Sequence, residues 1–89
     1  MRLRYLADEA GDGLCRVAYA IPRRTGGAVV RNRLRRRLRA AVDQVAADMA
    51  PGAYLISPDA TAIDMDFNEL IDSLRKSVRA AGASREDTT

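Results

Sequence analysis

The sequence contains no histidine and a single cysteine, Cys15. Histidine is the commonest general base and a frequent zinc ligand, so its absence excludes the usual histidine-based catalytic and zinc sites. A lone cysteine can form neither an internal disulfide nor a cysteine metal cluster, which favours a reducing compartment. We therefore expect a cytoplasmic protein with no catalytic residues, no metal site and no bound cofactor of its own.

Long hydrophobic runs are also absent. No apolar stretch approaches the roughly 18 residues that a membrane span needs, and the first residues, Met-Arg-Leu-Arg-Tyr, lack the apolar core of a secretory signal. A chain of 89 residues with 47% hydrophobic and 30% charged residues is typical of one small globular domain. The sequence thus predicts a single domain over residues 1–82 with no membrane partner, followed by a disordered polar tail over residues 83–89.

Acidic residues are missing from the most basic part of the chain. Eight arginines lie between Arg23 and Arg39, where there is no aspartate or glutamate. Residues 1–40 carry 11 arginines against three acids, a net charge of +8, whereas residues 41–89 carry four bases against nine acids, a net charge of −5. Guanidinium groups bind phosphate bidentately and stack on bases, so this arginine field favours a nucleic acid as partner. The alternative is a solvated helix face, although a purely structural surface would intersperse the two signs.

Hydrophobic periodicity predicts where the first elements lie. Residues 2–7 alternate with a period of two, as in a strand, and residues 14–21 form a second strand that Pro22 ends. We expect these two strands to pair as a hairpin. A helix is predicted from about residue 28 to 49, and residues 53–57 form a short apolar strand of the kind found in a sheet centre.

A second helix is predicted in the last third of the chain. Asp66 and Glu69 have the spacing of a capping box at its start, and Gly82 ends it. The order is therefore β-β-α-β-α. This order predicts an α+β fold, a two-layer α/β sandwich in which helices pack against a small sheet.

Two arginines fall on or beside the apolar side of the first helix. A guanidinium buried there without a partner would cost several kcal/mol, so Arg31 and Arg35 either snorkel past the helix end, pair with a loop carboxylate, or border a cleft. Gly26 and Gly27 precede this helix and allow a ligand to approach closely. The helix N-terminus adds free N–H groups and a positive dipole end, which suit phosphate, so the cleft is favoured.

The segment that begins at Arg23 and ends at Arg39 reads Arg-Arg-Thr-Gly-Gly-Ala-Val-Val-Arg-Asn-Arg-Leu-Arg-Arg-Arg-Leu-Arg. It closely resembles the signature of the bacterial ribonuclease P protein component, in which two basic residues and a glycine turn precede an Arg-Asn-Arg triplet that opens a basic helix. The resemblance continues through the apolar strand and the second helix, so it covers nearly the whole chain. Members of that family usually begin with a further helix, whereas this chain starts at the first strand.

The resemblance implies a fold similar to the second domain of ribosomal protein S5, with a left-handed βαβ crossover. It also implies an auxiliary RNA-binding subunit of ribonuclease P, a tRNA-processing endoribonuclease whose RNA subunit is the ribozyme and uses Mg²⁺ to remove the 5′ leader of precursor tRNA. The implied partners are that RNA subunit and the leader, with no DNA. By position, the RNA-binding residues would be Arg23, Arg24, Arg31, Asn32, Arg33, Arg35, Arg36 and Arg39, and the leader cleft would comprise Tyr5, Arg31 and Asn32.

Three other functions fit parts of the sequence. A ribosomal or other structural RNA-binding protein would have the same charge pattern without any link to cleavage. A metal-dependent nuclease acting alone could use Asp59, Asp64 and Asp66, but loop solvation and helix capping already explain these acids. A DNA-binding helix-turn-helix is disfavoured, because the basic helix lies between strands and does not follow another helix closely.

Overall fold

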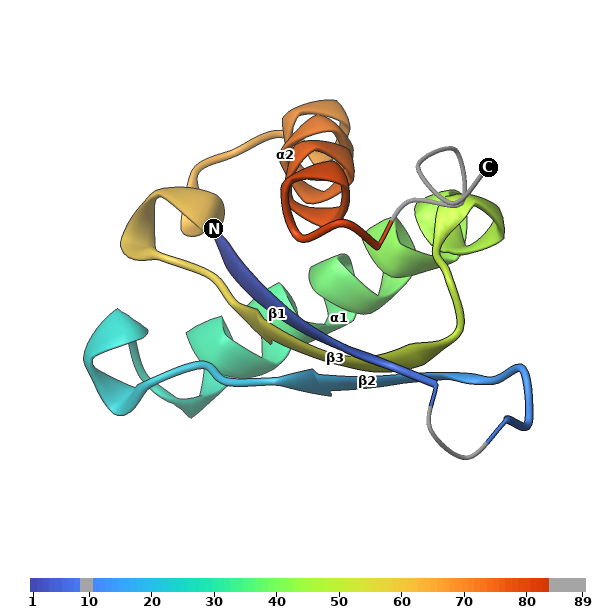
Figure 1. The fold of residues 1–89 in the computed structure, drawn as a ribbon. Coiled ribbons are helices and arrows are strands. Elements are labelled where there is room, and N and C mark those ends of the chain that lie inside the picture. Colours follow the sequence, from blue (N-terminus) through green and yellow to red (C-terminus); the bar gives the residue numbers. More distant parts are fainter. Residues whose placement is uncertain (9–10, 84–89) are drawn as a thin grey trace.

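Two α-helices cover one face of a three-stranded sheet in the computed structural model, which describes residues 1–8 and 11–83 (Figure 1). In chain order the elements are β1 (Arg2–Ala7), β2 (Cys15–Tyr19), the 3-10 helix η1 (Arg23–Thr25), α1 (Ala28–Val45), the 3-10 helix η2 (Ala46–Asp48), β3 (Gly52–Ser57), the 3-10 helix η3 (Ala60–Ile63) and α2 (Phe67–Ala80). The predicted order β-β-α-β-α and the two-layer α+β architecture are confirmed.

Strand β3 lies at the centre of the sheet, whose order is β1-β3-β2. It pairs antiparallel with β1, where Tyr5 lies opposite Tyr54, and parallel with β2, where Val17 lies opposite the same residue. The predicted hairpin between the first two strands is therefore wrong, because β3 separates them. The physical reason lies in the side chains. The nearly continuous apolar sequence of β3 suits the centre of the sheet, whereas β1 and β2 carry outward arginines that suit edges.

Alternation along the strands gives the sheet two unlike faces. The helix-facing side chains are buried or half-buried: Leu3, Tyr5, Val17, Tyr19, Tyr54 and Ile56. The opposite face is exposed and carries Arg2, Arg4, Leu6, Arg16, Ala53 and Leu55. Since β2 and β3 are parallel neighbours joined through α1, these three elements form a βαβ unit.

Helix α1 packs on α2 and on the sheet through the apolar stripe that the spacing predicts. Leu34, Leu38, Ala41 and Val45 are buried in the core together with Met49. The α-helix ends at Val45, four residues before the predicted end, because the chain tightens into η2 before β3. Val30, at the start of the stripe, is 39% exposed, so the first turn of α1 extends beyond the core.

Helix α2 begins at the cap that the sequence predicts. The carboxylate of Asp66 accepts a hydrogen bond from the Glu69 backbone N–H at 2.8 Å, and Leu70, Leu74 and Val78 fill the core. After α2 the chain turns at Gly82, and Ala83, expected in the polar tail, is buried instead; its carbonyl accepts from the Ala50 N–H at 2.7 Å. Residues 84–89 of that predicted tail lie outside the described residues. Neither of the two helices is long and apolar enough to cross a membrane.

Candidate nucleic-acid interface

Helix α1 carries six arginines and one acid, Asp43, and η1 adds Arg23 and Arg24 directly before it. The recorded ion pairs within residues 1–8 and 11–83 join Arg16 to Asp12 and the Met1 amino group to Asp59. None of the arginines of η1 or α1 pairs with a carboxylate in this part of the chain. The positive charge of the exposed arginines in this set is therefore available to an external anion.

Four of the predicted RNA-binding residues share one face of α1. Asn32, Arg35, Arg36 and Arg39 follow the spacing of helical neighbours and, with Val29, line a hollow of about 460 Å³. Arg35 donates from Nη1 to the Asn32 Oδ1 at 3.1 Å, which holds these two side chains together. Val29 is 82% exposed on the same surface. This α1 hollow, as we call it below, brings four polar or charged groups and one apolar side chain to the protein surface.

Arg31 turns away from the α1 hollow toward the glycine turn. Its Nε donates to the Gly26 carbonyl at 3.2 Å, and the side chain is half-buried. Arg31 therefore neither snorkels past the helix end nor pairs with a loop carboxylate. It pairs with a backbone carbonyl. Arg31 therefore links η1 to the first turn of α1.

Arg33 and Arg37 lie on the other flank of α1, beside Val30 and Ile63. Arg33 is exposed, whereas Arg37 is half-buried and spans three backbone carbonyls. It donates from Nη1 to the carbonyls of Ala62 and Ile63, both at 3.4 Å, and from Nη2 to the carbonyl of Met65. Its guanidinium thus fixes the segment between η3 and α2.

The Tyr5 side chain lies on the helix-facing side of the sheet and lines neither the α1 hollow nor the hollow beside Arg33 and Arg37. Its hydroxyl donates to the Pro51 carbonyl at 2.9 Å, and its ring lies 5.0 Å from that of Tyr54 at an interplanar angle of 37°. The structure therefore does not bring Tyr5, Arg31 and Asn32 together in one hollow. The place of Tyr5 on a leader path stays a prediction, and its observed contacts are those of a core residue.

Tyr19 lies on the same helix-facing side of the sheet, near the middle of α1. Burial raises the pKa of its phenol above the ordinary value of 10.0, and the nearby guanidinium of Arg39 opposes that rise. The side chain is half-buried against the core. Tyr19 thus places an uncharged, packed ring beside Arg39.

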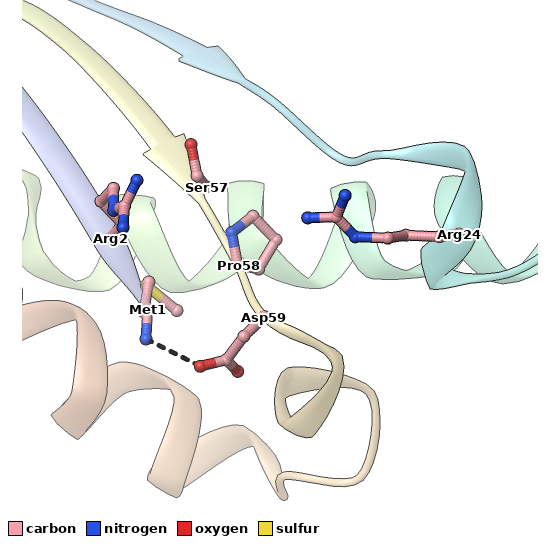
Figure 2. A pocket seen from close by; sticks show the side chains of 6 residues that line it. All are labelled: Met1, Arg2, Arg24, Ser57, Pro58 and Asp59. Atoms are coloured by element: carbon pink, nitrogen blue, oxygen red, sulfur yellow. Dashed lines mark hydrogen bonds and ion pairs between the residues drawn. The ribbon is translucent and has the colours of Figure 1, made fainter.

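Arg24 belongs to a second basic hollow, at the end of the sheet. Met1, Arg2, Arg24, Ser57, Pro58 and Asp59 line it, and its volume is about 420 Å³ (Figure 2). Arg2 is not among the RNA-binding residues predicted from the sequence, because the expected hairpin gave no reason to place the start of β1 beside η1. The available signal was the alternation of β1, which puts Arg2 and Arg4 on its solvent side.

Two of the three acids considered for a nuclease, Asp59 and Asp66, have structural partners, whereas Asp64 is exposed. Asp59 accepts hydrogen bonds from the Thr61 hydroxyl and from the Met1 amino group at 3.3 Å, and these contacts lower its pKa. Asp66 caps α2. Among the described residues, no group of three histidine, cysteine or carboxylate side chains is arranged to hold a metal ion.

A family model for ribonuclease P matches residues 1–82. The chain belongs to the ribonuclease P protein family. It is 36% identical over 72 residues to the ribonuclease P protein component of Brucella suis, which covers 79% of this chain and 51% of that protein. The component of Beutenbergia cavernae is 36% identical over 61 residues, covering 64% of this chain and 51% of the relative. The chain thus spans about half the length of the curated relatives that it matches.

Solved ribonuclease P proteins have the same fold. The Staphylococcus aureus protein superposes with a TM-score of 0.77 at 17% identity, covering 91% of this chain and 73% of that one. The Thermotoga maritima protein superposes with a TM-score of 0.68 at 20% identity, covering 83% and 79%. Within this ribonuclease P fold, the Arg-Asn-Arg triplet occupies the first two turns of α1.

Proposed function

We propose that this protein is an auxiliary RNA-binding subunit of ribonuclease P. It would bind the RNA subunit and the 5′ leader of precursor tRNA and assist the Mg²⁺-dependent removal of that leader. The observation that carries the proposal is the set of exposed arginines on η1 and α1, none of which forms an ion pair with a carboxylate among the described residues, in a chain of this family. The alternative is a ribosomal or other structural RNA-binding protein. The same positive charge supports that role, but the family match does not.

The chemistry of the α1 hollow favours an RNA backbone. Arg35, Arg36 and Arg39 can each present two parallel N–H groups to a phosphate, and Asn32 supplies an amide that both donates and accepts. Arg23 and Arg24 extend the positive surface before the helix, and Arg33 extends it along the opposite flank. Neutralising several phosphates releases counterions, which supplies most of the affinity.

The 5′ leader is proposed to pass the start of α1. The N-cap of the helix is Gly27, which provides no side-chain cap, so the first N–H groups of α1 are available to an anion. Asn32 is exposed beside them, whereas Arg31 holds the glycine turn in position through Gly26. In this arrangement Arg31 acts by positioning the turn, and Asn32 contacts RNA.

The protein would contribute charge and not catalytic groups. It has no histidine, and two of the three acids considered for catalysis are held in an ion pair and a helix cap. Cleavage is proposed to belong to the RNA subunit with Mg²⁺. The arginines would replace part of the Mg²⁺ that holds two RNA polyanions together.

The salt dependence of RNA binding tests this proposal. Affinity for a bacterial ribonuclease P RNA transcript should fall steeply with salt, with a slope of log K against log salt near −3 for about four phosphates neutralised. The double substitution Arg36→Gln and Arg39→Gln should reduce that slope. The matched control, Arg75→Gln with Lys76→Gln on exposed positions of α2, should leave it nearly unchanged. A flat salt response, or equal effects of both pairs, would contradict the proposal.

A further inference from the structure

The basic hollow at the end of the sheet is built from segments far apart in the sequence. Arg2 comes from the start of β1, Arg24 from η1, and Ser57 and Pro58 from the end of β3. Figure 2 shows the two arginines on opposite sides of Pro58, with the guanidinium of Arg24 extending from η1 toward it. The fold, and not the helical motif, therefore brings this pair together.

The hollow continues toward β2. A neighbouring hollow of about 450 Å³ shares Arg2, Arg24, Ser57 and Pro58 with the first and adds Ala20, Ile21 and Pro22. The two together form a trough across the end of the sheet, which we call the sheet-end trough. Its floor includes the buried Pro58, and its two arginine side chains are exposed.

The charges in this trough do not cancel one another. Neither Arg2 nor Arg24 has a carboxylate partner within residues 1–8 and 11–83. Asp59, the acid that lines the trough, accepts hydrogen bonds from the Thr61 hydroxyl and the Met1 amino group. Two guanidinium groups therefore remain for an external anion, and the Ser57 side chain adds a hydroxyl beside them.

We propose that the sheet-end trough is a second RNA site, which binds the phosphate backbone of a single-stranded segment through Arg2 and Arg24. The proposal rests on the proposed function, because it assumes an RNA ligand. A trough with a charged group on each side of an apolar floor admits one backbone, whereas a duplex presents its phosphates on a convex surface. Because Arg24 directly precedes α1, a strand could reach the trough from the α1 hollow through η1.

The test compares variants in their binding of a fluorescein-labelled oligouridine of about ten nucleotides. Arg2→Gln should weaken binding roughly tenfold, as expected for a lost charge-assisted contact, and should reduce the salt slope by about 0.7. Arg4→Gln is the matched control. Arg4 is an exposed arginine on the same face of β1, it does not line the trough, and its replacement should change affinity less than twofold. Arg24→Gln should likewise weaken binding of the oligouridine more than Arg23→Gln does.

A duplex RNA of the same length provides the second arm. Arg2→Gln should leave duplex affinity unchanged, and circular dichroism should show that every variant stays folded. Equal losses for Arg2→Gln and Arg4→Gln, or equal losses on single-stranded and duplex RNA, would overturn the trough while leaving the proposed function intact. Failure of the unmodified protein to bind any RNA would overturn both.

Discussion

The arginines of α1 have different roles, although they form one run in the sequence. The role of each depends on the groups that its guanidinium contacts. Arg31 donates to the glycine turn, Arg37 donates to the segment before α2, and Arg36 lies in the exposed α1 hollow. A helix with alternating signs would neutralise such side chains, whereas here backbone carbonyls engage some of them and leave the others for a ligand.

Substituting Arg37 should lower stability, and substituting Arg36 should lower RNA affinity. Arg37→Ala removes hydrogen bonds to the carbonyls of Ala62, Ile63 and Met65, so the free energy of unfolding should fall by about 1–3 kcal/mol. Arg36→Ala removes an exposed side chain and should change the free energy of unfolding by less than about 0.5 kcal/mol.

Urea unfolding and RNA binding, measured on both variants, separate the two roles. Under conditions where both proteins are folded, Arg37→Ala should bind RNA nearly as well as the unmodified protein, and Arg36→Ala should bind more weakly. If the two variants lost the same stability and the same affinity, only the total charge of α1 would matter.

At the scale of the elements, the cap of α2 gives a pH-dependent prediction. The hydrogen bond from the Glu69 N–H lowers the pKa of Asp66 below its ordinary value of 3.8, so the folded state favours the charged carboxylate. The stabilisation is complete above that ordinary value and is lost as pH falls through the lowered pKa of the folded state. Asp66→Ala should therefore reduce the melting temperature by several degrees near neutral pH.

Thermal unfolding measured between about pH 3 and pH 7 tests whether the charged Asp66 carboxylate stabilises α2. The difference in melting temperature between Asp66→Ala and the unmodified protein should shrink toward the acid end. Asp64→Ala, a nearby exposed acid without a recorded side-chain hydrogen bond, should show no such trend. A pH-independent difference for Asp66→Ala would mean that the carboxylate does not stabilise the helix through its charge.

The pairing of β1 with β3 depends on the absence of a side chain at Gly52. A Cβ there would lie 2.3 Å from the Leu6 carbonyl oxygen and 2.8 Å from Cε1 of Tyr5, and its φ of +148° disfavours other residues. Gly52→Ala should cost at least about 2 kcal/mol of unfolding free energy. Gly27→Ala has no atom within 4 Å of the added carbon and should cost about 1 kcal/mol or less. Equal losses in chemical denaturation would contradict this account of the sheet.

The sequence predicts the positions of the helices and strands in this fold better than it predicts which strands pair. The stripe Leu34, Leu38, Ala41 and Val45 and the Asp66 cap are local patterns, and the structure has both. Strand pairing depends on residues far apart in the sequence: β1 pairs with β3 across 45 to 55 residues, and β2 pairs with β3 across 37. The apolar sequence of β3 indicates a central strand, but it does not indicate which strands flank it. Arg2 could not be predicted for the same reason, because it lines one hollow with Arg24 only in a sheet in which β1 pairs with β3.

For the whole molecule, charge is divided between halves of the chain. Residues 1–40 carry a net charge of +8 and residues 41–89 a net charge of −5, from 11 arginines against three acids and four bases against nine acids. No arginine of η1 or α1 forms an ion pair with a carboxylate among the described residues of the second half. Such a surface suits the proposed binding of RNA.

The most direct test is cleavage of precursor tRNA by a bacterial ribonuclease P RNA over a Mg²⁺ titration, with and without the protein. We expect the protein alone to cleave nothing and its addition to lower the Mg²⁺ concentration needed for 5′-leader removal, with a smaller effect from Arg36→Gln combined with Arg39→Gln. Cleavage by protein free of RNA, or a Mg²⁺ requirement that the protein does not change, would contradict the account.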